Sequence, residues 1–185
     1  MNVPNLLSLL RILLIPVFII LIMDERFGWA LMTFAAAGVT DGIDGLIARI
    51  THQKTELGAY LDPIADKLLL SSAFIVLAIL QILPRWLTVI VITRDVIILV
   101  GFVVFLLMDK RPSIQPSLLS KMTTVLQTTT VLLALVRSCT SSLDSLVVVA
   151  VYGTMVLTIL SGSHYIYVGT QMLNGKQPSP TLHQE

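Results

Sequence analysis

Long apolar stretches alternate with short polar connections along the chain, and this pattern predicts a helical bundle. A helix needs about twenty mostly apolar residues to cross the hydrocarbon core of a bilayer. The six stretches that reach this length occupy residues 5–23, 29–50, 57–83, 86–108, 117–136 and 143–173. Since an open sheet edge is not tolerated in lipid, we expect an all-α integral membrane protein, a bundle of six transmembrane helices.

The same pattern predicts one structural unit followed by a short tail. All six predicted helices fall within residues 1–175, which we assign to a single membrane domain. Residues 176–185 include Pro178 and Pro180 and continue no apolar stretch. We therefore expect this tail to be disordered.

Composition supports the membrane assignment and narrows the possible partners. The chain of 185 residues is 55% hydrophobic, with a mean hydropathy of +0.88, and only 12% of its residues are charged. A soluble domain carries roughly twice as much charge. The net charge of +1, without a basic cluster, indicates no nucleic-acid partner. Cys139 is the only cysteine, which excludes an intrachain disulfide and a cysteine metal site.

Basic residues in the connections predict the orientation of the bundle. Cytoplasmic connections of membrane proteins carry an excess of lysine and arginine. With a cytoplasmic N-terminus, the inner connections hold Arg49, Lys54, Lys110, Arg111 and Lys176, and the outer ones hold Arg26, Arg85 and Arg137. This small excess predicts that the N-terminus and the inner connections face the cytoplasm. We expect a multi-pass protein of the inner (cytoplasmic) membrane.

Four aspartates interrupt the second and third apolar stretches at a regular spacing. The pattern is Asp41-x2-Asp44-Gly45-x2-Ala48-Arg49, followed after eight residues by Gly58-x3-Asp62-x3-Asp66. At helical spacing each set lies on one face of its helix, and a tight turn between the helices would let all four carboxylates converge. Carboxylates that close repel each other, and divalent cations relieve the repulsion. An all-oxygen site suits Mg²⁺, Mn²⁺ or Ca²⁺ rather than zinc.

Small residues and one cation accompany the aspartates. Gly45, Ala48 and Gly58 lack bulk on the same faces, which leaves room for a ligand against the backbone. Arg49 supplies a positive charge for an anionic oxygen. Metals that neutralise phosphate charge and a carboxylate that activates a nucleophile are the parts of a phosphoryl-transfer site. The structural alternative is that an aspartate pairs with Lys67 and that the small residues only permit close helix contact.

The stretch TDGIDGLIARITHQKTELGAYLDPIADK, residues 40–67, resembles the signature of the CDP-alcohol phosphatidyltransferases, and every fixed position of that signature is present. The resemblance extends over most of the chain, through Pro4-Asn5-x2-Ser8-x2-Arg11, Arg94 and Lys121-x2-Thr124. It implies transfer of a phosphatidyl group from a CDP-linked lipid to an alcohol, with release of CMP. It also implies an active site at the cytoplasmic ends of the second and third helices.

The resemblance implies roles for individual residues. Asp41, Asp44 and Asp62 match the ligands of a site for two Mg²⁺ (or Mn²⁺) ions, which Asp66 completes. Asp66 also matches the catalytic base that takes the proton from the acceptor hydroxyl. The residues that match positions around the donor, CDP-diacylglycerol, are Asn5, Ser8, Gly45, Ala48, Arg49 and Gly58. Because members of the family often dimerise, we expect a homodimer.

Basic residues outside the signature bear on the acceptor alcohol. Arg94 and Lys121 lie in otherwise apolar helices, where an unpaired cation is costly, and Arg111 lies in the connection between them. We interpret these three residues as a pocket for a phosphate group on the acceptor. One structural alternative is an ion pair of Arg94 with Asp95, although adjacent helix positions do not face each other. The other is snorkelling of Lys121 to the interface.

Glycerol 3-phosphate is the acceptor that this pocket favours, because it carries its own phosphate. The whole chain resembles bacterial phosphatidylglycerophosphate synthases, a branch of the family. The alternatives are phosphatidylglycerol as acceptor, as in cardiolipin synthases, and inositol phosphate. Asp95 after Arg94 and Ser120 before Lys121 are features shared with the cardiolipin-forming branch. A more remote alternative is a cation transporter whose aspartates bind the translocated ion.

Overall fold

The computed structural model describes residues 3–51, 56–107, 118–140 and 143–173. Within these ranges it describes the backbone alone for residues 3–8, 41–64, 102–103, 105–107 and 172–173. The helices are α1 Val3–Met23, α2 Phe27–Thr51, α3 Glu56–Ile79, α4 Arg85–Leu107, α5 Leu118–Thr140 and α6 Asp144–Leu173. The described part of the chain is therefore all-α, as predicted. The predicted disordered tail lies outside the described residues.

Two helix boundaries differ from the predicted ones by about one turn. α3 ends at Ile79 rather than at residue 83, and α5 continues to Thr140 rather than ending at residue 136. α3 ends early because Gln81 adopts a left-handed backbone, with φ of 60°. No glycine marks this turn in the sequence, so hydropathy alone extended the helix through it.

α1 also ends in a turn with a left-handed residue, and its hydrogen bonds show how such a turn ends a helix. Glu25 has a φ of 58°, and the N–H of Arg26 donates to the carbonyl oxygen of Leu21 at 2.8 Å. Such a bond satisfies a carbonyl that the helix end leaves open. Glycine usually holds the left-handed position, because a side chain there costs about 1–2 kcal/mol. The turn leads directly into α2.

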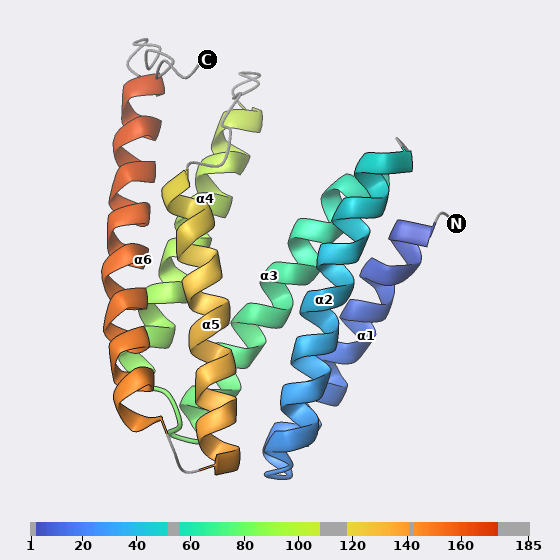
Figure 1. Cartoon of the computed structure of the whole chain (residues 1–185). Helices are drawn as coiled ribbons and strands as arrows, with labels where there is room; N and C mark the ends of the chain where they lie inside the picture. Colours follow the sequence, from blue (N-terminus) through green and yellow to red (C-terminus); the bar gives the residue numbers. More distant parts are fainter. Residues whose placement is uncertain (1–2, 52–55, 108–117, 141–142, 174–185) are drawn as a thin grey trace.

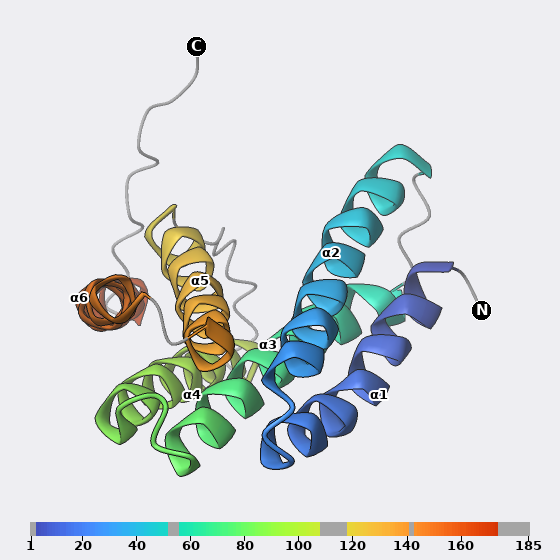
Figure 2. The same ribbon diagram turned by 60° about the horizontal axis from the view of Figure 1, so that its bottom comes forward.

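The six helices form two layers of three (Figures 1 and 2). Figure 2 shows α4, α3 and α1 in one layer, with α6, α5 and α2 in the other. Neighbouring helices contact each other within and between the layers, with α3 central in one layer and α5 central in the other. α2 and α3 lie diagonally across the layers, and both contact α1 and α5. This arrangement places α1 and α5 on the two sides of the helix pair that carries the aspartates.

The apolar core lies toward the end of the bundle that contains the α1–α2 and α3–α4 turns. Phe18 of α1 and Phe34 of α2 are buried there, with ring centroids 5.4 Å apart. Phe74, Leu87 and Leu135 bring α3, α4 and α5 into the same cluster. The opposite end, with the N-terminus in Figure 1, carries the aspartate motif. The apolar core and the aspartate motif therefore lie toward opposite ends of the bundle.

Hydrogen bonds between buried hydroxyl and amide groups join α5 to α6. The hydroxyls of Thr130 and Thr154 lie 2.8 Å apart, and the Gln127 amide donates to the Thr158 hydroxyl at 3.3 Å. A Cβ added to Gly153 would lie 3.3 Å from Leu126, so the glycine permits close approach of the two helices. Small residues and interhelical hydrogen bonds are the usual means of helix association in lipid.

Two helices in the described part of the chain are long and apolar enough to span a membrane. They are α5 and the Asp144–Gln171 part of α6. Large apolar side chains are also exposed on the outer surfaces of the other helices, such as Leu13, Met32 and Val89. An apolar outer surface of this extent indicates a membrane protein.

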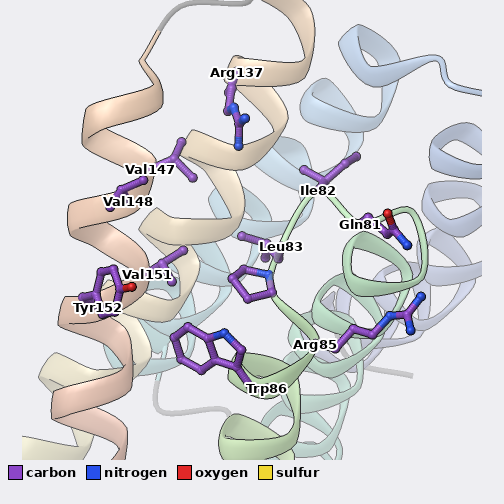
Figure 3. Close-up of a pocket in the computed structure, with 11 residues that line it drawn as sticks. Gln81, Ile82, Leu83, Arg85, Trp86, Arg137, Val147, Val148, Val151 and Tyr152 are labelled. Carbon is purple, nitrogen blue, oxygen red and sulfur yellow. The ribbon is translucent and has the colours of Figure 1, made fainter.

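A cavity of about 540 Å³ opens at the end of the bundle away from the aspartate motif. Figure 3 shows its walls, which are the α3–α4 turn with the start of α4, the end of α5 and the first turns of α6. None of its lining residues belongs to the predicted active site.

Candidate active site

The backbone places the two halves of the aspartate motif on facing ends of α2 and α3. Residues 41–49 lie in the second half of α2, and residues 58–66 lie near the start of α3. Asp41 lies ten residues before the end of α2, and Asp66 lies ten residues after the start of α3. Each is therefore about 15 Å along its helix from the end. The helix ends themselves are at most about 18 Å apart, because only residues 52–55 separate them.

The side chains of most motif residues lie outside the described part. This holds for Asp41, Asp44, Gly45, Ala48, Arg49, Gly58 and Asp62, and also for Asn5 and Ser8 in the first turns of α1. Their helical backbone confirms the predicted spacing on α2 and α3. Asp66 is described and is half-buried on α3.

The donor set fits a hard divalent cation. The backbone puts aspartates three residues apart on α2 and four residues apart on α3, the spacings that align side chains on one helix face. Among the residues whose side chains are described, no three histidine, cysteine or carboxylate groups form a cluster that could hold a metal ion. The side chains of Asp41, Asp44 and Asp62 are not among these residues, so their role as metal ligands stays a prediction.

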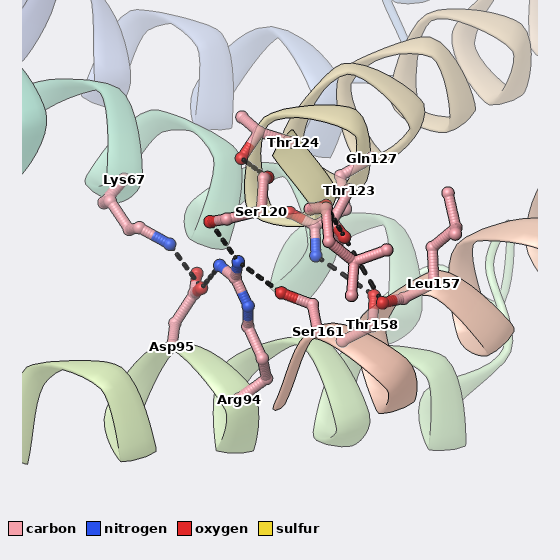
Figure 4. A network of polar contacts seen from close by, with 11 residues as sticks. Lys67, Arg94, Asp95, Ser120, Thr123, Thr124, Gln127, Leu157, Thr158 and Ser161 are labelled. Atoms are coloured by element: carbon pink, nitrogen blue, oxygen red, sulfur yellow. Dashed lines mark hydrogen bonds and ion pairs between the residues drawn. The ribbon is translucent and has the colours of Figure 1, made fainter. Parts of the chain in front are cut away.

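A network of charged and hydroxyl groups lies directly beside Asp66 in the chain (Figure 4). Lys67 of α3 pairs with Asp95 of α4, and Arg94 donates to the same Asp95 oxygen at 2.8 Å. The other end of the Arg94 guanidinium donates to Ser120 at 2.7 Å and to Ser161 at 3.0 Å. One guanidinium therefore joins α4 to α5 and α6, while Asp95 joins α4 to α3.

Exposure distinguishes the two cations of this network. The Arg94 side chain is only 3% exposed, whereas that of Lys67 is 43% exposed. The Nε atom of Arg94 has no hydrogen-bond partner in the described part of the structure. Asp95 is shared by both cations, and Asp66, the residue before Lys67, is a second carboxylate that acts on Lys67. Two cations therefore face two carboxylates, and Lys67 is the cation that reaches the surface.

The structure decides between some of the sequence interpretations and leaves others as predictions. The ion pair of Arg94 with the adjacent Asp95 does form, because the long side chain bends toward its neighbour. Its role in acceptor binding stays a prediction. Lys121 is exposed near the start of α5, on a helix that flanks the motif. Arg111 lies outside the described residues.

Sequence reasoning missed three members of the network. The sequence predicts Lys67 only as a partner of an aspartate, and Ser120 only as a feature shared with the cardiolipin-forming branch. In the structure both belong to one cluster around Arg94 and Asp95. Ser161 of α6 begins the run Ser161-Gly162-Ser163-His164-Tyr165, which resembles the phosphatidylglycerophosphate synthases, but that resemblance does not mark it as a partner of Arg94. Its role depends on α6 lying against α4, and the linear sequence does not specify which helices are neighbours.

Comparison with known proteins identifies the family. Residues 1–160 match the family model described as CDP-alcohol phosphatidyltransferase. The chain belongs to this family. It is therefore a transferase of phospholipid synthesis rather than a cation transporter.

Similar proteins include members of two branches of the CDP-alcohol phosphatidyltransferase family. A probable phosphatidylglycerophosphate synthase of Mycobacterium tuberculosis is 36% identical over 174 residues, covering 89% of this chain and 80% of that protein. A CDP-diacylglycerol–glycerol-3-phosphate 3-phosphatidyltransferase of Pseudomonas fluorescens is 42% identical over 105 residues, 53% of each chain. A CMP-forming cardiolipin synthase of Rattus norvegicus is 48% identical over 99 residues, covering 53% of this chain and 33% of that protein.

Proposed function

We propose that this phosphatidyltransferase transfers the phosphatidyl group of CDP-diacylglycerol to the hydroxyl of glycerol 3-phosphate, giving phosphatidylglycerophosphate and CMP. The observation that carries the proposal is similarity along nearly the whole chain to a relative named as a probable phosphatidylglycerophosphate synthase. The relatives named as cardiolipin synthases match over about half of this chain. The two cations Lys67 and Arg94 beside the signature support an acceptor with its own phosphate.

The proposed reaction assigns its proton transfer to Asp66. The carboxylate takes the proton of the acceptor hydroxyl, and the acceptor oxygen forms a bond to the β-phosphorus of the donor. The bond between that phosphorus and the bridging oxygen breaks, and CMP leaves with the bond electrons. Asp66 is half-buried on α3, one residue before Lys67, and is the last aspartate of the motif.

Two divalent ions, Mg²⁺ or Mn²⁺, would be held by Asp41, Asp44, Asp62 and Asp66. When bound, they would neutralise the charge of the diphosphate. The donor would lie against α1, α2 and α3, in contact with Asn5, Ser8, Gly45, Ala48, Arg49 and Gly58. The contacts of α1 with both α2 and α3 support this part of the proposal.

The acceptor phosphate would lie on the other side of the motif, toward α4 and α5. Arg94, Lys121 and Arg111 are the proposed contacts, and we add Lys67 because its side chain is the more exposed cation of the network. Arg94, buried under Ser120 and Ser161, would act mainly by holding Asp95 and adding positive potential.

The proposed setting is the cytoplasmic membrane, crossed by all six helices, with the aspartates facing the cytoplasm and the chain paired as a homodimer. The exposed apolar side chains along the helices support the membrane part of this proposal. The excess of basic residues at the motif end supports the orientation.

A cardiolipin synthase that uses phosphatidylglycerol as acceptor is the second candidate. The identity of 48% with the rat cardiolipin synthase over 99 residues favours it. A phosphate is present on this acceptor too, so the charge of the network does not separate the two candidates.

An acceptor comparison tests the proposal. Purified protein receives CDP-diacylglycerol and Mg²⁺ with glycerol 3-phosphate, phosphatidylglycerol, inositol phosphate or serine in parallel, and the lipid product is identified by mass spectrometry. We expect phosphatidylglycerophosphate from glycerol 3-phosphate and no new lipid from the other three. Cardiolipin as the sole product would overturn the acceptor assignment and leave the reaction class intact.

A further inference from the structure

The cavity at the turn end of the bundle has the composition of an amphiphile site. Leu83, Val147 and Val151 form a buried apolar wall. Trp86 and Tyr152 stand at its mouth, both partly exposed, with ring centroids 6.1 Å apart. Aromatic side chains with a polar edge collect at the membrane–water interface, so this mouth has the character of an interface.

Two arginines add positive charge to the otherwise apolar lining. Figure 3 shows Arg137 of α5 directed into the cavity and Arg85 of the α4 start at its edge. Arg137 lies 2.6 Å from a carboxylate oxygen of Asp144. Arg85 makes no ion pair in the part of the chain that the structure describes. The cavity region therefore has two cations against one carboxylate.

The Arg137–Asp144 pair leaves the guanidinium available to a further anion. Its side chains are 41% and 69% exposed, and exposed ion pairs of this kind contribute little. The 2.6 Å contact with Asp144 is made by the Nε atom of Arg137. A guanidinium has five N–H donors, and its two terminal nitrogens match two oxygens of a phosphate.

We propose that this cavity binds one anionic phospholipid, at the opposite end of the bundle from the aspartate motif. Its phosphate would lie on Arg137, with Arg85 at the edge, and an acyl chain would follow Val147 and Val151. Trp86 and Tyr152 would flank the glycerol region. A free phosphate could use the arginines but not the apolar wall, and a zwitterionic lipid could use the wall but would gain less from the excess charge. The proposal rests on the membrane location and not on the reaction at the aspartates.

Lipid binding to matched variants tests the proposal. The purified full-length chain is placed in nanodiscs of phosphatidylcholine with increasing phosphatidylserine, and retained lipid is counted by native mass spectrometry. Retention is compared between matched variants of the cavity, so lipid held at the substrate site is the same in all of them. We expect phosphatidylserine to be retained over phosphatidylcholine, and Arg85→Gln with Arg137→Gln to weaken this retention by about five-fold for each arginine removed.

Two further variants control the result. Arg26→Gln removes an exposed cation in the turn at the same end of the bundle but outside the cavity, and should leave retention within about two-fold, because it lies away from the proposed phosphate. Asp144→Asn frees Arg137 from its pair and should increase retention, so the proposal is testable even if the arginine variants misfold.

Three results would overturn the proposal. The first is equal retention of phosphatidylserine and phosphatidylcholine by the unmodified protein, and the second is an equal loss in Arg26→Gln. The third is full displacement of the lipid by millimolar inorganic phosphate, which would make the site an anion site only. Release of CMP measured on the same variants should stay near that of the unmodified protein. Absence of CMP release from the unmodified protein would count against the proposed function and leave the lipid site standing.

Discussion

Arg94 shows how a buried cation is accommodated in an apolar bundle. Its guanidinium contacts one carboxylate and two serine hydroxyls, which come from three helices. The carboxylate, Asp95, also compensates Lys67. A single side chain therefore neutralises part of the charge of two cations, so its loss should have larger consequences than that of an ordinary surface acid.

Replacement of Asp95 with asparagine should destabilise the protein markedly. The change leaves Arg94 and Lys67 without their shared carboxylate, and breaking a buried pair costs about 3–5 kcal/mol. We expect a smaller loss, about 2 kcal/mol, because Lys67 is partly exposed and reaches solvent. The free energy of unfolding, measured by SDS titration in mixed micelles, checks this.

Asp144→Asn is the matched control for that measurement. It removes the carboxylate of an exposed ion pair with Arg137 and should change the free energy of unfolding by less than about 1 kcal/mol. Equal losses in the two variants would mean that the Asp95 pair is not buried as the structure shows.

At the scale of elements, hydropathy predicted all six helices, because each apolar stretch is bounded by charged or turn residues. It could not place the end of α3, because the stop depends on a backbone angle at Gln81 rather than on a change of polarity. It also could not show that α2 and α3 lie diagonally across two layers. The neighbours of a helix are set by side-chain fit among all six, which no single stretch encodes.

Replacement of Glu25 with glycine should stabilise the protein. Glu25 holds the left-handed position that ends α1, with φ of 58°, and glycine relieves this strain. The gain is partly offset by the greater freedom of glycine in the unfolded chain, so we expect about 0.5–1 kcal/mol. Thermal unfolding in detergent measures the change.

Glu25→Ala separates backbone strain from charge. Alanine removes the carboxylate but keeps a Cβ, so its unfolding temperature should stay near that of the unmodified protein. A rise as large as that of the glycine variant would assign the effect to the charge of Glu25 at the end of α1 and not to the turn.

At the scale of the whole molecule, the aspartate motif lies at one end of the bundle and the apolar core lies toward the other. The spacing of the aspartates was enough to predict the reaction class, because the signature is long and specific. The partners of Arg94 were harder to predict, since Ser120 and Ser161 come from helices that meet it only in the folded bundle. The cavity at the turn end was missed because its walls come from two segments, residues 81–86 and 137–152, that are far apart along the chain.

The most direct test of the proposed reaction is release of CMP from CDP-diacylglycerol by the purified protein. We expect release only when both Mg²⁺ (or Mn²⁺) and glycerol 3-phosphate are present, and its loss on chelation of the metal. Asp66→Asn should lower the rate by about 10²–10⁴-fold, the usual contribution of a general base, whereas Asp24→Asn, in the exposed α1–α2 turn, should not. A rate near that of the unmodified protein in Asp66→Asn, or release without metal, would contradict the account.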